Sequence, residues 1–365
     1  MDIAKLDERL ANQPLTVTDV AWHSPFETPF SIHGMHYDEE LSLFVRMPQE
    51  VAAEVSPSVK SLSRMTSGGR VRFRTDSVYV ALSCLVPAFT PAPHMAMTTL
   101  NGFSVYVDGQ YRGKVVPSYP DLLAAVDKTV AFRGSCSIPK TGELHDVEIY
   151  FPLYGCVKEI YIGLREGARI EPPRAYSIAA PLVFYGLSIT QGACASRPGN
   201  DYAARLSRML DADYINLGFS GNGNAEPAML EYLTKLPASA YIYDYNYYSN
   251  RPERVLPPHL SIYEILRKAN PLAVIMMVDK PCTIYSRSNY EARSAIMRAS
   301  YEETIRRGDD LVGYLDGADF FGSGVEHDAC VVDSDHPNDL GFWHMAQNLY
   351  EPLKTLLARR AIKLG

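Results

Sequence analysis

The hydrophobic residues in the first half of the chain follow a two-residue period in short runs. Arg70-Val71-Arg72-Phe73-Arg74 alternates strictly between polar and apolar side chains, as a strand with one buried face does. Similar runs follow at residues 78–82, 103–107, 145–150 and 157–162. Because Gly and Pro separate these runs and few segments have helical spacing, residues 1–170 are predicted to form an antiparallel, jelly-roll-like β-sandwich.

In the second half, apolar runs alternate with segments of helical spacing. Strands are predicted at residues 181–185, 214–217, 240–243, 272–278 and 311–315. Helices are predicted after the capping residues Asn200-Asp201, after a Ser261 cap, through residues 290–306, and through residues 339–360. This alternation predicts a parallel sheet with helices on both faces, over residues 171–365. Ile170-Glu171-Pro172-Pro173-Arg174 is expected to be the linker between the two domains, because paired prolines favour an extended spacer.

Composition and charge exclude several classes of protein. Lys and Arg number 35 and Asp and Glu 42, which gives a net charge of −7 and argues against a nucleic-acid partner. No apolar run approaches the roughly 18 residues that span a membrane, so no membrane partner is expected. The N-terminal residues have no apolar segment typical of a secretory signal, so a cytoplasmic location is expected. The six cysteines lack metal-site spacing and are expected to be free, mostly buried thiols.

Chemistry-bearing residues follow the predicted strands at the positions where a parallel sheet binds ligands. Ligands bind at the carboxyl ends of such strands. There the chain places Gly186–Gly192, Gly218–Gly223 and Asp244–Asn246, while Asp333–His336 comes just before the final helix. These segments supply a hydroxyl, glycine amides, a side-chain amide and an acid–imidazole pair. Together they are the inventory of an acyl-transfer site.

The first two of these segments resemble the SGNH (GDSL-type) hydrolase superfamily, and the resemblance extends over residues 180–358. The first block of that family is Gly-Asp-Ser, and this chain has Gly186-Leu187-Ser188, followed by Thr190 and Gly192 as in the family. The glycine of the second block, which serves the oxyanion hole, falls on Gly221.

The later blocks are matched as well, with one further departure. The third block, usually Gly-x-Asn, reads Asp244-Tyr245-Asn246, and the Asp-x-x-His of the fifth block falls on Asp333 and His336. Leu187 and Asp244 are therefore the two departures from the pattern of the family.

The first half resembles the β-sandwich module that precedes the hydrolase domain in a bacterial subgroup of this superfamily. Gly102-Phe103-Ser104-Val105-Tyr106 is similar to its Gly-x-Asp-Leu-Tyr signature, without the Asp and the Leu. The resemblance implies a flavodoxin-like three-layer α/β/α hydrolase domain behind this module.

The resemblance also implies a catalytic triad. Ser188 would be the nucleophile, His336 the general base, and Asp333 the group that orients the imidazole. Asp335 is an alternative orienting group, but in an extended segment the side chain next to His336 points the other way, which favours Asp333. A simple turn serine remains the structural alternative for Ser188.

An oxyanion hole and a substrate site follow from the same resemblance. The backbone N–H groups of Ser188 and Gly221 and the side-chain amide of Asn246 would stabilise the developing alkoxide. Candidate substrate-binding residues are Arg197, Tyr245 and Tyr247, although a solvated arginine and strand tyrosines are the alternatives. The arginines of 70–74 are expected on an exposed strand face.

These features predict a serine esterase that removes a short acyl group, acetyl in the first place, from a small-molecule or oligosaccharide substrate. No metal is expected, because the histidines lack ligand spacing, and the mechanism implies no cofactor. Two alternatives stay open: a glycan-binding protein whose site has decayed at Leu187 and Asp244, and an acyltransferase that uses the same serine. The sequence leaves the oligomeric state open.

Overall fold

The computed structural model describes residues 15–88, 92–123, 128–244, 259–281, 287–321 and 327–364. The chain forms two compact units. The first, here the sandwich unit, comprises Met1–Arg46, Arg64–Ala175 and Ser196–Gly199. The second, here the parallel-sheet unit, comprises Met47–Ser63, Tyr176–Ala195 and Asn200–Gly365. A single domain boundary at residue 170 stays a prediction, and these units differ from it by the segments Met47–Ser63 and Ser196–Gly199 and by residues 171–175.

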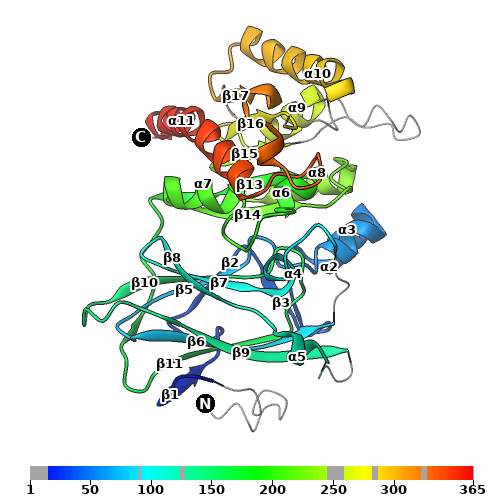
Figure 1. Ribbon diagram of the computed structural model, residues 1–365. Coiled ribbons are helices and arrows are strands. Elements are labelled where there is room, and N and C mark those ends of the chain that lie inside the picture. Colours follow the sequence, from blue (N-terminus) through cyan, green and yellow to red (C-terminus); the bar gives the residue numbers. More distant parts are fainter. Residues whose placement is uncertain are drawn as a thin grey trace. The chain divides into compact units, whose positions relative to one another are not determined.

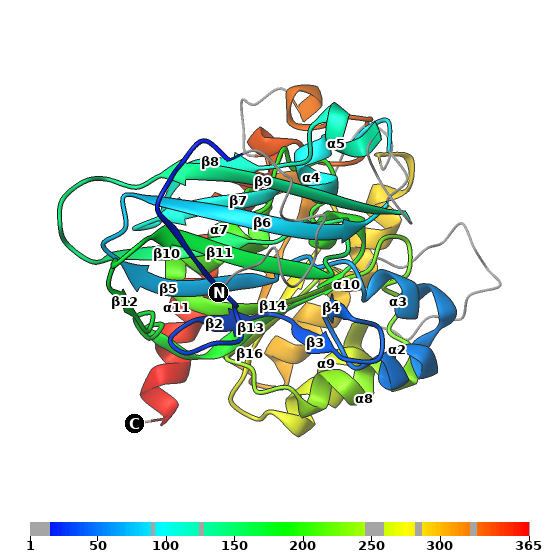
Figure 2. The same ribbon diagram turned by 90° about the horizontal axis from the view of Figure 1, so that it is seen from below.

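The sandwich unit contains two antiparallel sheets, as the alternating runs predict (Figure 2). One sheet has the order β1 (Val20–His23), β11 (Glu159–Arg165), β6 (Tyr79–Pro87), β9 (Thr129–Ser137). The other has the order β12 (Ile170–Glu171), β5 (Arg70–Thr75), β10 (His145–Tyr150), β7 (Phe103–Val107), β8 (Gln110–Val115), with β2 (Ser31–His33) also paired to β5. Alternate residues such as Val71 and Phe73 face a shared apolar core.

The polar positions of β5 correct one expectation. Arg70 is 0% exposed and Arg72 is 7% exposed, so this row of arginines is not an exposed strand face. Arg72 lies opposite Glu148 on β10 and forms an ion pair with it at 2.9 Å, while the guanidinium of Arg70 donates to the Gly68 carbonyl at 2.8 Å. Alternation identified the strand, but it could not show that Arg70 and Arg72 would be buried, one hydrogen-bonded to a carbonyl and the other paired with a carboxylate.

Short elements were also missed in the first half. The expected linker at Ile170–Glu171 is strand β12, which pairs with β5, so the extended segment begins at Pro172. A small hairpin and four short helices were not predicted: β3 (His36–Asp38), β4 (Leu43–Val45), α2 (Gln49–Val55), α3 (Pro57–Leu62), α4 (Met97–Asn101) and α5 (Tyr119–Leu123). Each helix has seven residues or fewer, which is too short for a helical period to stand out.

The parallel-sheet unit is a five-stranded parallel sheet with helices on both faces (Figure 1). Its strand order is β14 (Ala212–Gly218), β13 (Ile178–Gly186), β15 (Ala240–Tyr243), β16 (Val274–Val278), β17 (Val312–Leu315). Numbered along the chain, this order is 2-1-3-4-5, which is the flavodoxin-like arrangement. The second strand pairs on one side of the first and the third on the other, so the order reverses at the carboxyl end of β13.

Two groups of helices bury the two faces of this sheet. α7 (Tyr202–Leu210) and α11 (Asp339–Leu364) pack against each other and against one face. α8 (Pro227–Lys235), α9 (His259–Ala269) and α10 (Arg287–Arg306) pack in sequence on the other, where α2 joins α8. None of the described helices is both long enough and apolar enough to cross a membrane.

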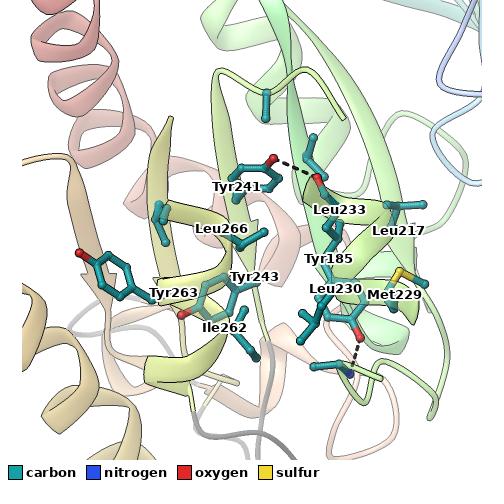
Figure 3. Close-up of a cluster of buried hydrophobic side chains, with 14 of the residues drawn as sticks. Tyr185, Leu217, Met229, Leu230, Leu233, Tyr241, Tyr243, Ile262, Tyr263 and Leu266 are labelled. Carbon is teal, nitrogen blue, oxygen red and sulfur yellow. Dashed lines mark hydrogen bonds between the residues drawn. The ribbon is translucent and has the colours of Figure 1, made fainter. Parts of the chain in front are cut away.

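Buried tyrosines are prominent in the core between β15 and the second group of helices (Figure 3). Tyr241 donates its hydroxyl to the Leu233 carbonyl at 3.0 Å, and Tyr185 accepts the Ala225 N–H at 2.6 Å. Tyr243 is fully buried among α9 side chains. These rings therefore contribute to the core, with their polar tips hydrogen-bonded.

The helix starts were predicted with mixed success. Asp201 caps α7 as expected, because its carboxylate accepts the Ala204 N–H at 3.0 Å. Ser261 does not cap α9, which begins at His259. The buried His259 ring stacks on Tyr243, with ring centroids 6.3 Å apart, and this packing belongs to the first turn of the helix.

Candidate active site

Ser188 lies immediately after the central strand β13, at the point where the strand order reverses. β13 ends at Gly186, Leu187 is the N-cap, and Ser188 is the first residue of the short helix α6 (Ser188–Gln191). Gly192 is the C-cap of α6, and its φ of 98° lies in the left-handed region that favours glycine. The sharp turn from strand to helix places the hydroxyl at the edge of the sheet, where substrates reach such folds.

A continuous chain of hydrogen bonds links Ser188 to a carboxylate. The Ser188 Oγ lies 2.8 Å from Nε2 of His336, and the other ring nitrogen, Nδ1, lies 2.8 Å from Oδ2 of Asp333. The backbone N–H of His336 also donates to Asp333, at 2.8 Å. Burial raises the pKa of Asp333, but the hydrogen bonds from the backbone and ring of His336 outweigh it, and the net pKa lies below its ordinary value. The carboxylate is therefore ionised near neutral pH and can stabilise an imidazolium.

The loop that carries His336 is braced at both ends. Val331 and Pro337 form a β-bridge, and the Val332 N–H donates to the His336 carbonyl at 2.9 Å. Asn338 caps α11, because its side-chain oxygen accepts the Gly341 N–H at 3.1 Å. The chain therefore enters α11 in a fixed direction, with His336 two residues before the cap.

The adjacent carboxylate, Asp335, has a different partner. It forms an ion pair with Lys280 at 2.5 Å. Three residues of separation bring Asp333 to the ring, whereas Asp335 turns toward β16 and the lysine that follows it. This geometry matches the alternation argument for extended backbone.

The turn at Ser188 is held by side chains to which sequence reasoning assigned no role. The Asn216 amide donates to the Thr190 carbonyl at 2.7 Å, and its oxygen accepts the Gly218 N–H at 2.9 Å. The Gln191 side chain accepts the Ser220 N–H at 3.0 Å. These bonds tie α6 to the end of β14. Gln191 stands inside a segment that the strand ends singled out, and Asn216 stands in the predicted strand 214–217, but spacing alone does not show where a side-chain amide points.

Asp244, one of the two departures from the family pattern, also contacts this turn. It follows β15 and is 5% exposed. Its carboxylate accepts the Leu187 N–H at 3.3 Å and the Thr190 hydroxyl at 2.7 Å. The two departures thus lie in contact with each other beside Ser188.

The structure describes part of the expected oxyanion hole. Gly221 lies on the exposed loop after β14, with a φ of 66° and open space where a side chain would be. Asn246, Tyr245 and Tyr247 lie outside the described residues. The roles of all four residues stay predictions.

Arg197 and Cys194 follow α6 but have different surroundings. Arg197 belongs to the sandwich unit, where its guanidinium lies over the Tyr111 ring at 3.9 Å from the centroid, a cation–π contact. Its role in substrate binding stays a prediction. Burial, with the nearby Asp333 and Asp335 charges, raises the pKa of the Cys194 thiol to about 12, so it carries no reactive thiolate.

Comparisons with known proteins match both halves of the chain. A model of the GDSL-like lipase/acylhydrolase family matches residues 179–354, and a model of the N-terminus of SGNH hydro-type esterases matches residues 20–170. No curated protein matches the chain.

Several solved structures share the fold. A GDSL-like lipase from Bacteroides ovatus is 25% identical, with a TM-score of 0.76. The match covers 93% of this chain and 98% of the lipase. The salicylyl-acyltransferase SsfX3 from a tetracycline biosynthetic pathway is 20% identical, with a TM-score of 0.70 and the same coverage of 93% and 98%. An acetyl xylan esterase from the rumen bacterium Butyrivibrio proteoclasticus is 14% identical, with a TM-score of 0.54, over 93% of this chain and 99% of that one.

These matches agree with the fold of both units. The chain belongs to the SGNH (GDSL-type) ester hydrolases that carry an N-terminal β-sandwich module.

Proposed function

We propose that this protein is a serine esterase that removes a short acyl group, acetyl in the first place, from a carbohydrate. The observation that carries the proposal is the hydrogen-bonded chain from Ser188 through His336 to Asp333 at the carboxyl end of the central strand. A serine hydroxyl is too weakly acidic to attack an ester unaided, and here a base lies within hydrogen-bond distance of it.

The reaction would proceed in two steps. His336 Nε2 takes the Ser188 proton as Oγ attacks the acyl carbonyl, and the same proton then passes to the departing sugar oxygen. In the second step His336 takes a proton from water as the water attacks the acyl-serine, and passes this proton to Ser188 Oγ as the carboxylic acid leaves. Asp333 keeps the proton of the imidazole on Nδ1, so that Nε2 faces Ser188 as an acceptor. The amides of Ser188, Gly221 and Asn246 would stabilise both tetrahedral intermediates.

The carbohydrate and the acetyl group rest on analogy. Among structures that share the fold, one is named an acetyl xylan esterase. Because this enzyme shares the fold at 14% identity, an acetylated carbohydrate is proposed as the substrate class by analogy. The intact triad supports an enzyme over a binding protein with a decayed site.

The first test compares p-nitrophenyl acetate, butyrate and octanoate as substrates for wild type, Ser188→Ala and Ser300→Ala. Ser300 is the matched control, because its hydroxyl donates to the Ile296 carbonyl within α10. We expect activity that favours acetate and is lost only in Ser188→Ala. The rate of acetate release from acetylated xylo-oligosaccharides is then compared with the rate from acetylated glucose, which tests which sugar the enzyme prefers. Ester hydrolysis that survives in Ser188→Ala would refute the mechanism.

An acyltransferase that uses the same serine is the second candidate, supported by the shared fold with a salicylyl-acyltransferase. The acyl-serine would then pass its acyl group to an alcohol faster than to water. Product analysis with increasing concentrations of xylose or glycerol distinguishes the two functions. Transfer that dominates at millimolar acceptor would favour the acyltransferase, whereas an unchanged yield of acetate would favour the esterase.

A further inference from the structure

The Asp244 carboxylate forms hydrogen bonds to the Leu187–Thr190 turn on both sides of Ser188. One carboxylate oxygen accepts the backbone N–H of Leu187, the residue before Ser188, at 3.3 Å. The other accepts the hydroxyl of Thr190, two residues after Ser188, at 2.7 Å. A single side chain from the end of β15 therefore fixes both the entry to α6 and its first turn.

These hydrogen bonds continue from the turn to α7 and β13. The Thr190 hydroxyl also lies 3.0 Å from the hydroxyl of Tyr202, which is fully buried on α7. The backbone N–H of Asp244 donates to the Tyr185 carbonyl on β13 at 3.0 Å. The turn is thus tied to β15, β13 and α7 through one buried network, and buried networks of this kind restrict motion when every member is satisfied.

The strand end before Ser188 leaves room for this carboxylate. A Cβ added to Gly186 would lie 2.2 Å from the nearer Asp244 oxygen and 2.4 Å from the Thr190 hydroxyl. The glycine of the first block is therefore required here by the Asp244–Thr190 pair.

The carboxyl of Asp244 is suited to a neutral role. Burial raises its pKa to about 7, against the opposing effects of the Thr190 and Leu187 hydrogen bonds. Near neutral pH it is therefore protonated for part of the time, and in that form Oδ2 donates to Thr190 while Oδ1 still accepts the Leu187 N–H. An asparagine can form both bonds in the same way.

We propose that Asp244 is a positioning residue, which holds the Leu187–Thr190 turn so that the Ser188 hydroxyl meets His336 at attacking distance. Asp244 and Leu187 are then not signs of a decayed site, because the carboxylate at 244 binds the backbone at 187. Misplacement of a reacting group by about 1 Å can cost roughly 100-fold in rate. The inference rests on the proposed function, since it concerns the same serine.

The test measures kcat and KM for p-nitrophenyl acetate and the rate at which a fluorophosphonate labels Ser188. The variants are Asp244→Ala, Asp244→Asn and Thr190→Val. Asp279→Asn is the matched control, because Asp279 follows β16 as Asp244 follows β15 and is 1% exposed, but its carboxylate contacts Tyr314 and the Lys280 N–H. Circular dichroism establishes which variants are folded.

For Asp244→Ala we expect kcat and the labelling rate to fall about 30-fold, with KM changed less than threefold. Asp244→Asn keeps kcat within threefold of the wild-type value, and Thr190→Val lowers kcat about 5- to 10-fold. Asp279→Asn keeps wild-type kcat.

The inference is overturned if folded Asp244→Ala keeps kcat within threefold of wild type, or if Asp244→Asn loses as much as Asp244→Ala. If Asp244→Ala does not fold, Thr190→Val decides, and an unchanged kcat in that variant overturns the inference. Wild-type protein that neither hydrolyses esters nor reacts with the fluorophosphonate overturns the proposed function instead, so the two failures are distinguishable.

Discussion

The two parts of the proposed catalytic triad are held in different ways. Around the Ser188 turn the supporting side chains are buried and come from neighbouring strands: Asn216 is 0% exposed and Asp244 is 5% exposed. The loop of Asp333 and His336 is more open, with side chains 33% and 18% exposed, and much of its support comes from its own residues. Ser188, the proposed nucleophile, is therefore held by the sheet, whereas His336, the proposed base, lies on a loop that is fixed where it enters α11.

This difference has a physical basis. A serine after a parallel strand is surrounded by other strand ends, which offer many fixed donors and acceptors. A histidine before a helix has neighbours along its own chain, and local hydrogen bonds are the main means of orienting it. We therefore expect the position of Ser188 to be sensitive to substitutions at residues far from it in the sequence. The position of His336 should be sensitive to substitutions at residues next to it in the sequence.

The largest effect is expected from the base itself. His336→Ala should lower kcat by about 10⁴-fold or more, because Ser188 then lacks a proton acceptor. Steady-state kinetics with p-nitrophenyl acetate measures this loss. The double variant Ser188→Ala/His336→Ala should lose no more than either single variant, since the two residues act as a unit. Losses that add in the double variant would show that they act separately.

Next in size is the pair of neighbouring carboxylates. Asp333→Asn should lower kcat by roughly 10²- to 10⁴-fold, because the amide no longer fixes the tautomer of His336. Asp335→Asn is the control from the same loop and should change kcat less than threefold, since that side chain pairs with Lys280. Equal losses in the two variants would contradict the assignment of Asp333.

A smaller effect is expected from the buried support of the turn. Asn216→Ala removes the bond to the Thr190 carbonyl, and should lower kcat about tenfold and the free energy of unfolding by about 1–3 kcal/mol. Asn348→Ala is the control: its amide also donates to backbone carbonyls, of Asp319 and Phe320, but far along α11. It should lose stability and keep kcat, as urea unfolding and kinetics on the same samples will show.

The last comparison is a pair of opposite pH dependences of the free energy of unfolding. The folded-state pKa of Asp333 is lowered, so its contribution is present above the unfolded pKa and is lost as the pH falls through the folded pKa. The folded-state pKa of Asp244 is raised to about 7, so its contribution is present below the unfolded pKa and is lost as the pH rises through about 7.

Urea unfolding between pH 3 and pH 8 tests this pair. The free energy of unfolding of Asp333→Asn should be lower than that of wild type at neutral pH. The difference should shrink as the pH falls toward 3. Asp244→Asn should gain on wild type as the pH rises from about 4 to about 7. The same sign for both variants would contradict the difference between the two regions.

Much of this organisation could be predicted from the sequence, because it depends on local patterns. The alternation of residues 70–74 and 145–150 identified two neighbouring strands of the sandwich, and strand ends in the second half identified the segments of the site. The separation of Asp333 and His336 by three residues was enough to expect one loop to carry both.

The rest depends on tertiary packing. The burial of Arg70 and Arg72 and the directions of the Asn216 and Gln191 side chains are set by neighbours from elsewhere in the chain. Asp244 was noticed as a departure, but its contact with Leu187 depends on the pairing of β13 with β15. Ser261 lies inside α9, and the first turn of that helix carries the buried His259 that stacks on Tyr243, a contact between segments that a local capping pattern does not show.

The most direct test of the account is to trap the acyl-serine. Wild-type protein would be mixed with p-nitrophenyl acetate, quenched with acid within the first turnover, and mapped by peptide mass spectrometry. We predict a single acetyl group on the peptide that contains Ser188, and none on Ser188→Ala. An acetyl group on a different residue, or a first turnover that is complete in Ser188→Ala, would contradict the account.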